Sequence, residues 1–332
     1  MGKYVAKRMG YMVAVFLLVS AALYFLYHLI PGDPVKAELE NFIKGNPNVT
    51  AEQIAAEKQA ITLRMGLDKP LPVRYVKWIM GFLSGNFGYS QSYRQPVAQV
   101  IAAPMQNTVI LNVMSVVLAL LVTIPLGIAC AVKKNSWFDR GVQVLTIIGF
   151  SVPVYIIALL FIYLFAVVLA WFPVGGMNTP GAEFSSGFLW LLDRMRYMAL
   201  PLLVMTAGSV GGMTRYIRTA MIDALGQDYI RTARAKGLSE FSVVCSHAWR
   251  NALLPVITLI IGWFLGIFGG SLMIENIFGI NGIGKLLYDA LMQKDYELVL
   301  AIQMFYVGIG SLGNLLIDLL YGVVDPRIRV TK

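Results

Sequence analysis

The segment that decides the fold is polar and separates two long apolar stretches: Asp228-Tyr-Ile-Arg-Thr-Ala-Arg-Ala-Lys-Gly237, followed by residues 238–255. Its first part predicts a short helix, because helix-forming residues run up to Gly237 and glycine can take the positive φ that ends a helix. Ser239 can then cap a second helix that has Glu240 in its first turn. Two short helices between apolar stretches form a rigid lever, whereas a linker would be richer in glycine and serine. We expect a docking element here, and a solvated basic linker is the alternative.

The composition is that of an integral membrane protein. Hydrophobic residues make up 58% of the 332 residues and charged residues 14%, whereas soluble domains carry about a quarter charged residues. The formal net charge of +9 would suggest a nucleic-acid partner for a soluble protein. Here the cations lie beside apolar stretches, where membrane topology and anionic lipid explain them. We therefore expect membrane lipid as a partner and no nucleic acid. The cysteines, Cys130 and Cys245, are too few for a disulfide framework and are expected to be reduced.

Six apolar stretches reach the length of roughly 20 residues that a helix needs to cross a bilayer. The first resembles the start of a signal peptide, but its apolar run is too long and no clear cleavage site follows, so we expect a retained helix. The third is longer than a bilayer needs, and Pro153 predicts either a kink near its cytosolic end or a surface turn before the helix. The stretches are residues 10–30, 107–132, 141–172, 197–216, 252–274 and 299–323.

Basic residues gather in four regions that share one side of the membrane if the chain crosses it six times. By the positive-inside rule that side is the cytosol, so both termini are expected in the cytosol and the polar segment faces it too. The basic residues are Lys3, Lys7, Arg8, Lys133, Lys134, Arg140, Arg215, Arg218, Arg231, Arg234, Lys236, Arg250, Arg327, Arg329 and Lys332.

The segment between the first two stretches predicts a small helical domain outside the cell. Thr50-Ala-Glu-Gln53 is a capping-box pattern, and it predicts a helix to about Met65 with Gly66 as its cap. A second, amphipathic helix is expected over residues 73–83. The expected organisation is a tail and first transmembrane helix (residues 1–30), an extracytoplasmic helical domain (31–106), and a five-helix core with a cytosolic loop at about 217–251 (107–332).

The second, third and fifth stretches contain no Asp, Glu, Lys, Arg or His. Transporters driven by protons need ionisable side chains at membrane depth, so we do not expect this chain to use an ion gradient by itself. Uncharged polar residues in the stretches either line a route for a polar solute or hydrogen-bond between helices. The pathway candidates among them are Asn112, Ser151, Thr206 and Ser209.

The chain carries no pattern of a catalytic or metal site. Its two histidines, His28 and His247, fall at opposite ends of the expected topology, so neither a metal cluster nor a catalytic triad is predicted. Residues 279–285 nearly match a phosphate-binding loop, but Leu286 stands where a Ser or Thr is needed and no strand precedes it. We instead expect residues 275–284 to form a tight external turn or a re-entrant loop.

A set of motifs resembles one protein family along almost the whole chain. Tyr229-Ile-Arg-Thr-Ala-Arg-Ala-Lys-Gly237, followed by Asn251-Ala-Leu-Leu-Pro255, resembles the cytosolic EAA-type loop in permease subunits of binding-protein-dependent ABC importers, in the form of the oligopeptide, dipeptide and nickel branch. The order and spacing of the motifs together are specific. The other motifs are Gly66-Leu-Asp-Lys-Pro-Leu-Pro72, Gly85-Asn-Phe-Gly-Tyr-Ser90, Asn107-Thr108, Ser151-Val-Pro153, Glu275-Asn-Ile-Phe278 and Lys294-Asp-Tyr296.

The resemblance implies an all-α integral membrane protein with six transmembrane helices, the type I ABC importer permease fold, in a bacterial or archaeal cell membrane. It also implies partners: a second homologous permease, two ATPase subunits and an extracytoplasmic substrate-binding protein. ATP and Mg would bind to the ATPase subunits, and this chain would be non-catalytic and hold no cofactor. The implied ATPase-coupling residues are Tyr229, Arg231, Thr232, Ala233, Arg234, Ala235, Lys236 and Gly237.

The sequence departs from the general EAA motif in the coupling loop. Arg231 stands where the glutamate is expected and Thr232 replaces the first alanine, so the salt bridge usually expected from that glutamate cannot form in the same way. Oligopeptides or dipeptides are the implied substrates, and nickel chelates, glutathione and sugars are the minority alternatives. Two functions of other classes stay open: a gradient-driven secondary transporter, and a membrane scaffold or sensor without flux.

Overall fold

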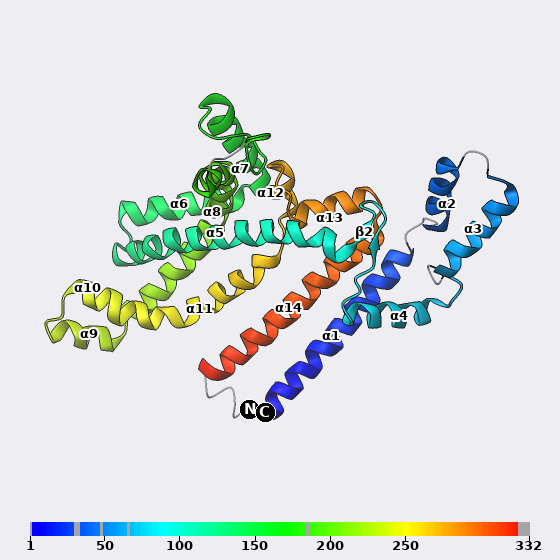
Figure 1. Cartoon of the computed structure of the whole chain (residues 1–332). Helices are drawn as coiled ribbons and strands as arrows, with labels where there is room; N and C mark the ends of the chain where they lie inside the picture. The colour runs from blue at the N-terminus through cyan, green and yellow to red at the C-terminus, as the bar shows by residue number, and fades with distance from the viewer. Residues whose placement is uncertain (1, 30–33, 47–48, 65–66, 183–185, 325–332) are drawn as a thin grey trace. The chain divides into compact units, whose positions relative to one another are not determined.

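The computed structural model describes residues 2–29, 34–46, 49–64, 67–182 and 186–324, and these are mostly helical (Figure 1). One two-stranded hairpin, β1 (Tyr89–Ser90) and β2 (Gln95–Pro96), interrupts the helices of this described part. The chain divides into two compact units. Unit 1 comprises Met1–Val100 and Ala290–Ser311, and unit 2 comprises Ile101–Asp289 and Leu312–Lys332.

Five helices of the described residues are long and apolar enough to cross a membrane, and a bent pair makes six if it counts as one span. The five overlap the first, second, fourth, fifth and sixth predicted stretches. The fourth prediction was too short, since its helix extends about ten residues beyond it at each end. The helices are α1 (Gly2–Leu29), α5 (Val97–Val132), α8 (Gly187–Leu225), the helical stretch Glu240–Phe268 that contains α11 (Trp249–Leu265), and α14 (Tyr296–Val324).

The third stretch is broken where Pro153 stands. Helix α6 (Trp137–Ser151) and the helix formed by α7 (Val154–Phe161) with its π-helical continuation η1 (Ile162–Val168) meet at an angle of 101°. A proline disfavours the helical conformation in the residue before it, and Val152 is extended. The predicted kink at Pro153 is confirmed as this break.

In unit 2, small residues let α8 approach its neighbours closely. A Cβ atom built on Gly211 would lie 2.7 Å from the carbonyl oxygen of Thr146 on α6. A Cβ atom on Gly127 of α5 would lie equally close to the side chain of Ile217 on α8. Such contacts allow helices to pack tightly in a membrane, where the hydrophobic effect does not drive them together. Helices α5, α6 and α8 therefore form a packed group.

In unit 1, aromatic side chains join α1 to α4 (Leu71–Leu83). The Ser20 and Tyr75 hydroxyls are 2.7 Å apart, and the ring of Tyr24 contacts those of Tyr75 and Trp78. Before α4, α2 (Pro34–Gly45) and α3 (Ala51–Arg64) form a helical hairpin, of which only α3 was predicted.

The predicted capping box at the start of α3 is confirmed. The backbone N–H of Thr50 donates to Gln53 Oε1 (3.0 Å), and the backbone N–H of Gln53 donates to Thr50 Oγ1 (3.4 Å). The predicted cap at Gly66 lies outside the described residues. The amphipathic helix predicted over residues 73–83 is confirmed as α4.

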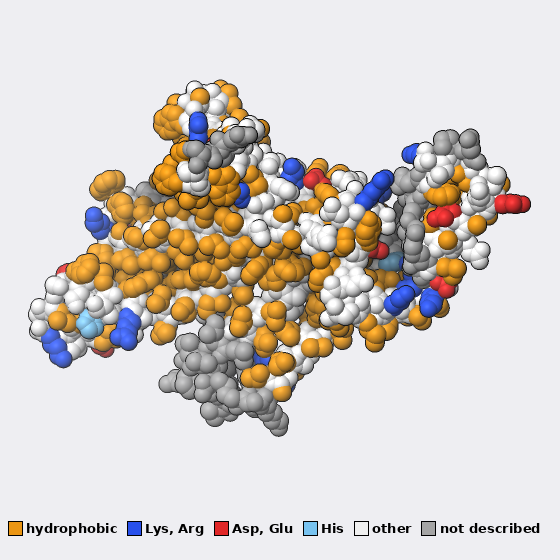
Figure 2. All heavy atoms as spheres, in the orientation of Figure 1, with side chains coloured by type: hydrophobic (Ala, Val, Ile, Leu, Met, Phe, Trp, Pro, Cys, Tyr) orange, Lys and Arg blue, Asp and Glu red, His pale blue; other side chains and the backbone are white. Residues whose placement is uncertain are grey.

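The surface of unit 2 shows where a membrane would surround it. Hydrophobic side chains cover the sides of its long helices, and Lys and Arg gather at the end formed by α9 (Asp228–Ala235) and α10 (Glu240–Ser242) (Figure 2). Leu121 on α5, Leu145 on α6 and Leu160 on α7 are among the exposed large side chains. Apolar surface of this extent is expected where lipid is the solvent.

Candidate docking site

Helix α9 is the short helix predicted in the polar segment, and it ends as expected. Gly237 has a φ of 76°, and its backbone N–H donates to the carbonyl of Arg234 (2.9 Å). The backbone N–H of Leu238 reaches back to the carbonyl of Ala233 (3.3 Å), which satisfies another carbonyl of the last turn. The helix therefore stops sharply, and the chain turns toward α10.

One face of α9 is buried against the membrane helices. Ile230 and Ala233 belong to a hydrophobic cluster with Met221 on α8, Val243 on the π-helix η2 (Val243–Ala248) and Val256 on α11. Ile230 is fully buried, although the sequence gave us no reason to name it as a site residue. Helix α9 therefore packs on η2 and shares one buried cluster with the long helices α8 and α11.

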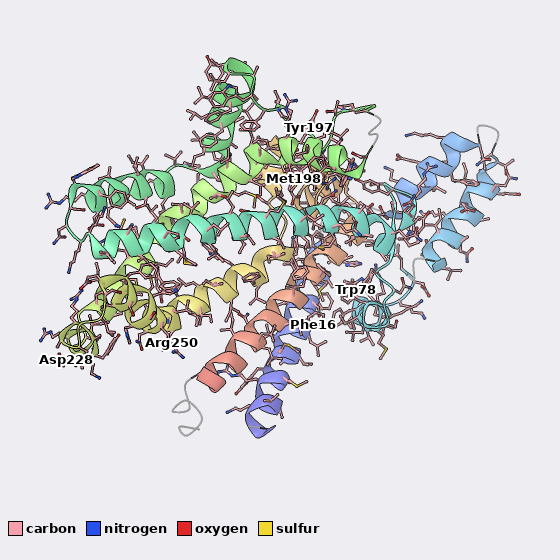
Figure 3. The ribbon with its side chains drawn as sticks, turned by 60° about the vertical axis from the view of Figure 1, so that its left-hand side comes forward. Phe16, Trp78, Tyr197, Met198, Asp228 and Arg250 are labelled. Carbon is pink, nitrogen blue, oxygen red and sulfur yellow. The ribbon has the colours of Figure 1, made fainter. Side chains whose placement is uncertain are left out.

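The opposite face of α9 is open to solvent and basic. Of the predicted coupling residues only Ala233 is buried, and it belongs to the anchor rather than to the exposed face. Figure 3 shows Asp228, at the start of α9, and Arg250, on α11, at one end of unit 2. Tyr197 and Met198, near the beginning of α8, lie far from that end. The exposed coupling residues are Tyr229, Arg231, Thr232, Arg234, Ala235, Lys236 and Gly237.

An ion pair braces the turn between α9 and α10. Arg234 Nε donates to Glu240 Oε1 (2.8 Å), and Arg234 Nη2 donates to Glu240 Oε2 (3.2 Å). Ser239 caps α10, since its Oγ accepts from the backbone N–H of Ser242 (3.4 Å), as predicted. Both partners of the ion pair are exposed, so it orients the loop more than it stabilises the fold. Arg231 stands in place of the glutamate of the general EAA motif, and Glu240 supplies a carboxylate elsewhere in the same loop.

A buried ion pair joins α8 to α6 close to the docking element. Arg218 Nε and Nη2 donate to the two carboxylate oxygens of Asp139, each at 2.6 Å, and the Asp139 side chain is 2% exposed. Asp139 also accepts from the backbone N–H of Asn135 (2.9 Å), whereas its own N–H donates to Ser136 Oγ (3.2 Å). Sequence reasoning used Arg218 only for orientation and missed Asp139. The sequence does contain a signal for Asp139, because this residue follows Ser136 at the three-residue spacing of a helix-capping pair.

At the other end of unit 2, a buried glutamate joins three segments. Glu275 Oε1 accepts from Thr108 Oγ1 (2.8 Å), and Glu275 Oε2 accepts from the backbone N–H of Lys285 (2.9 Å). Thr108 Oγ1 in turn accepts from the backbone N–H of Ile283 (2.8 Å). Burial raises the pKa of the Glu275 carboxyl, although the hydrogen bonds to the carboxylate oppose this shift.

The tight turn predicted over residues 275–284 is shorter than expected, and its external or re-entrant position stays a prediction. Helix α12 (Leu272–Ile277) and helix α13 (Ile283–Met292) occupy its two ends, and only the residues between them form a turn. Gly282 and Gly284 lie against the Glu275 carboxylate, where a Cβ atom would collide with it. Gly282 and Gly284, which give residues 279–285 their similarity to a phosphate-binding loop, therefore leave space for the Glu275 carboxylate of the same chain.

The same end of unit 2 is held by a second hydrogen-bonded set. Asn107 Nδ2 donates to the carbonyl of Asn281 (2.7 Å), and Arg194 Nη2 donates to Asn107 Oδ1 (2.8 Å). The Asn107-Thr108 motif thus ties the first part of α5 to α8 and to the turn after α12.

The four pathway candidates differ in their hydrogen bonds and burial. Asn112 Nδ2 donates to the carbonyls of Ile267 (2.7 Å) and Gly269 (2.9 Å), and Ser209 Oγ donates to the carbonyl of Met205 (2.9 Å). Ser151 is an exposed residue at the α6–α7 bend. The Thr206 hydroxyl is buried without a partner among the described residues. Asn112 and Ser209 therefore act as hydrogen-bonding residues in this structure, and a pathway role stays a prediction.

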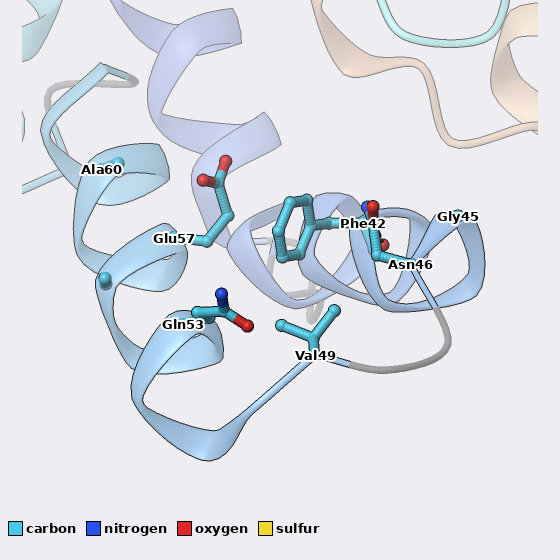
Figure 4. A pocket seen from close by; sticks show the side chains of 8 residues that line it. Phe42, Gly45, Asn46, Val49, Gln53, Glu57 and Ala60 are labelled. Carbon is cyan, nitrogen blue, oxygen red and sulfur yellow. Dashed lines mark hydrogen bonds between the residues drawn. The ribbon is translucent and has the colours of Figure 1, made fainter.

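Unit 1 contains an open pocket of about 670 Å³ between α2 and α3 (Figure 4). Most of its lining comes from outward-facing positions of these two helices, so it is a surface groove of the hairpin. Its lining residues are Phe42, Gly45, Asn46, Val49, Gln53, Ala56, Glu57 and Ala60.

Several apolar helices long enough to span a membrane, with a small amphipathic helix between α8 and α11 in the chain, define a multi-pass membrane protein. Residues 123–330 match the family described as "Binding-protein-dependent transport system inner membrane component", and residues 1–126 match the N-terminal family of the same membrane components. The chain belongs to this family, and is a permease subunit of its ABC importers in the oligopeptide, dipeptide and nickel branch, as the motifs predicted.

The alignments with similar proteins extend over almost the whole chain. The oligopeptide transport system permease protein AppB of Bacillus subtilis is 35% identical over 330 residues, 99% of this chain and 100% of AppB. The glutathione transport system permease protein GsiC of Salmonella paratyphi A is 35% identical over 326 residues, 98% of each chain. A Brucella suis protein, provisionally named a peptide permease, is 39% identical over 331 residues, 99% of each chain.

One solved structure shares the fold. A chain of the MetNI methionine ABC transporter, solved in inward-facing conformations, aligns with a TM-score of 0.50 and 15% identity, covering 67% of this chain and 96% of that chain. At this identity the likeness is one of fold alone.

Proposed function

We propose that this chain is the transmembrane permease subunit of an ATP-driven importer for oligopeptides or dipeptides. It forms the translocation pathway with a second homologous permease, and two ATPase subunits bind ATP and Mg²⁺ on its cytosolic side. An extracytoplasmic binding protein delivers the substrate. The names of AppB and of the Brucella suis relative support the peptide substrate.

The proposed topology has six spans, with the α6–α7 pair as the third, and both termini in the cytosol of a bacterial or archaeal cell. Two features of unit 2 support it. The basic turn before α6 and the basic helix α9 lie at the end that holds the Asp139–Arg218 pair. Asn107, Arg194 and Glu275 lie at the opposite end. The concentration of cations at one end favours the cytosol there. The basic tail at residues 327–332 lies outside the described residues.

The observation that carries the proposal is the mounting of α9. Its apolar face packs on η2 within the cluster that includes α8 and α11, whereas its basic face is exposed to solvent. Closure of an ATPase dimer would move α9 as a rigid body, and the packed cluster would pass this motion to α8 and α11. The ATPase subunits hydrolyse ATP, and this chain converts their motion into a change in the packing of the membrane helices.

Glutathione is the second candidate substrate, because GsiC is as similar to this chain as AppB is. Nickel chelates and sugars remain alternatives within the proposed family of importers. Glutathione is itself a short peptide with free carboxylates, so the same pathway chemistry would serve both.

The function is tested by purifying the tagged chain with its partners and reconstituting the assembly in liposomes. The expected result is a second permease and ATPase subunits in the preparation, and uptake of a labelled tripeptide that needs both ATP and the binding protein. Labelled glutathione in a parallel assay distinguishes the two substrates. Uptake by this chain alone, driven by an ion gradient, would support a secondary transporter instead. Partner binding without any flux would support a scaffold.

A further inference from the structure

The hairpin over residues 85–96 in unit 1 combines a buried base with an exposed tip. Strands β1 and β2 pair antiparallel, with Tyr89 opposite Pro96 and Ser90 opposite Gln95. Ser90 and Val97 at its base are fully buried, whereas every residue from 91 to 96 is exposed. The hairpin is therefore fixed at its base and presents its tip to solvent.

The base is held by the segment that begins α14. Ser90 Oγ donates to Asp295 Oδ2 (2.5 Å), and the backbone N–H of Ser92 donates to the same oxygen (3.0 Å). Asp295 is 2% exposed and also caps α14 through the backbone N–H of Leu298 (3.3 Å). Two motifs that lie about 200 residues apart, Gly85–Ser90 and Lys294–Tyr296, thus form one joint.

A second carboxylate fixes the approach to the hairpin. The backbone N–H of Tyr89 donates to Glu297 Oε2 (2.8 Å), and Gly88, with a φ of 89°, lies so close that a Cβ atom would meet this carboxylate. Main-chain bonds to two acidic side chains hold the hairpin backbone rigidly, and a rigid loop loses little entropy when it binds a partner.

Two exposed cations beside this joint have strained backbones. Arg94 has a φ of 52° and Lys294 a φ of 58°, a region that residues other than glycine, asparagine and aspartate rarely adopt. Glycine at either position would relieve the strain. Strained residues that the surrounding structure holds in place are found at functional sites, including ligand clamps. Arg94 and Lys294 lie at the same joint, and each has an exposed positive side chain. This arrangement indicates that the two charges have a function.

We infer that the tip of this hairpin, together with Lys294, is a docking surface for an acidic face of the extracytoplasmic binding protein. This inference rests on the proposed function, because it needs residues 85–96 to lie outside the cell. Tyr89, Tyr93 and Arg94 are of the residue types that contribute most to protein–protein binding energy, and Tyr89 is 46% exposed. Exposed cations attract an acidic partner and set its orientation.

The side chains of the tip favour a protein over a lipid surface. Gln91, Ser92 and Gln95 are polar and uncharged, and the tip over residues 91–96 lacks the leucine and phenylalanine that membrane-binding segments insert into the bilayer. They can donate and accept hydrogen bonds across a hydrated protein interface.

The test measures binding of the purified binding protein to the complete importer in nanodiscs, one set of zwitterionic lipid and one containing anionic lipid. Arg94→Glu and Lys294→Glu are each expected to raise the Kd about tenfold or more at low salt. Lys58→Glu, at an exposed position of α3, is the matched control and should leave the Kd as it is. Arg94→Gly removes the charge without backbone strain, so its Kd should also rise, whereas Arg94→Lys should keep most of the affinity.

Three results would overturn the inference. Unchanged affinity in Arg94→Glu and Lys294→Glu, with uptake still dependent on ATP and the binding protein, would reject the docking surface and leave the proposed function intact. An effect confined to the anionic nanodiscs would assign the charges to lipid. An equal loss in Lys58→Glu would show a general charge effect. Failure of the proposed function gives a different result, because the wild-type importer would then show no uptake that needs ATP and the binding protein.

Discussion

The carboxylate of Asp139 is almost fully buried, and the guanidinium of Arg218 is its charge partner. A pair of this kind is costly to break, because the remaining charge stays in a poorly solvated place. It joins α6 to the part of α8 that leads into α9. The pair therefore belongs to the structure through which movement of the docking element would reach the membrane helices.

Asp139→Ala should destabilise the subunit at the lower end of the roughly 3–5 kcal/mol that breaking a buried pair costs, since Arg218 keeps some contact with solvent. The midpoint of thermal unfolding in detergent measures this loss. Arg215→Ala, at an exposed position one turn earlier on α8, is the control and should have little effect. Asp139→Leu combined with Arg218→Met should recover most of the stability, because no charge is left unpaired. Equal unfolding midpoints for Asp139→Ala and wild type would contradict the importance of the pair.

Glu275 predicts a dependence of stability on pH. Burial raises the pKa of its carboxyl in the folded state above the ordinary value, so the folded protein holds this proton more tightly than the unfolded chain does. The resulting stabilisation is complete below the ordinary pKa of a glutamate and is lost as the pH rises through the raised value. Glu275→Gln has nearly the same shape and does not titrate. Its stability relative to wild type should therefore increase as the pH rises through this window.

The measurement is the unfolding midpoint of both proteins over a series of pH values. Glu52→Gln, at an exposed position of α3, is the matched control. A difference between Glu275→Gln and wild type that stays constant across the series would contradict the effect of burial on Glu275.

At the scale of elements, the sequence allowed good prediction of helices whose ends carry local signals. The capping box at Thr50, the end of α9 at Gly237, the cap at Ser239 and the break at Pro153 are all set by residues within a few positions of the boundary. Such signals depend on backbone conformation and short-range hydrogen bonds, which the sequence shows directly.

The elements that were missed depend on contacts between distant residues. The 85–96 hairpin is held by Asp295, and the helices around the 278–282 turn are held by Glu275 and Thr108. Likewise, the buried face of α9 could be identified only once Ile230 was seen against Met221 and Val243. Asp139 was missed for the same reason. A pattern along the chain does not reveal which distant segment will supply the partner of a buried polar group.

The packing of α6 on α8 predicts different effects for two neighbouring glycines. Gly211 faces the carbonyl of Thr146, whereas a Cβ atom on Gly212 would meet nothing within 4 Å. Gly211→Val should force the helices apart and lower stability by roughly 1–3 kcal/mol, as overpacked sites do. Gly212→Val is the matched control, and its unfolding midpoint should stay close to that of wild type. Similar midpoints for the two variants would show that the helices do not approach closely at Gly211.

At the scale of the whole molecule, composition and motif order were enough to predict the membrane class and the family. The number of spans was harder to predict, because the bent α6–α7 pair counts as one span only if the membrane contains both halves. The described residues also divide into two units by their contacts, and the domain boundaries at residues 30 and 106 stay predictions. Residues 290–311 join the first hundred residues through contacts such as Ser90–Asp295, which no local pattern indicates.

The central claim is that the exposed basic face of α9 transmits the action of an ATPase to the membrane helices. The most direct measurement is substrate-stimulated ATP hydrolysis and tripeptide uptake by the reconstituted importer carrying Arg231→Glu and Arg234→Glu. Both side chains are exposed, so the two permeases should still assemble. We expect both stimulated hydrolysis and uptake to fall well below wild type, whereas the control Lys58→Glu with Lys69→Glu, in unit 1, should match wild type. Unchanged hydrolysis and uptake in the α9 double variant would contradict the claim.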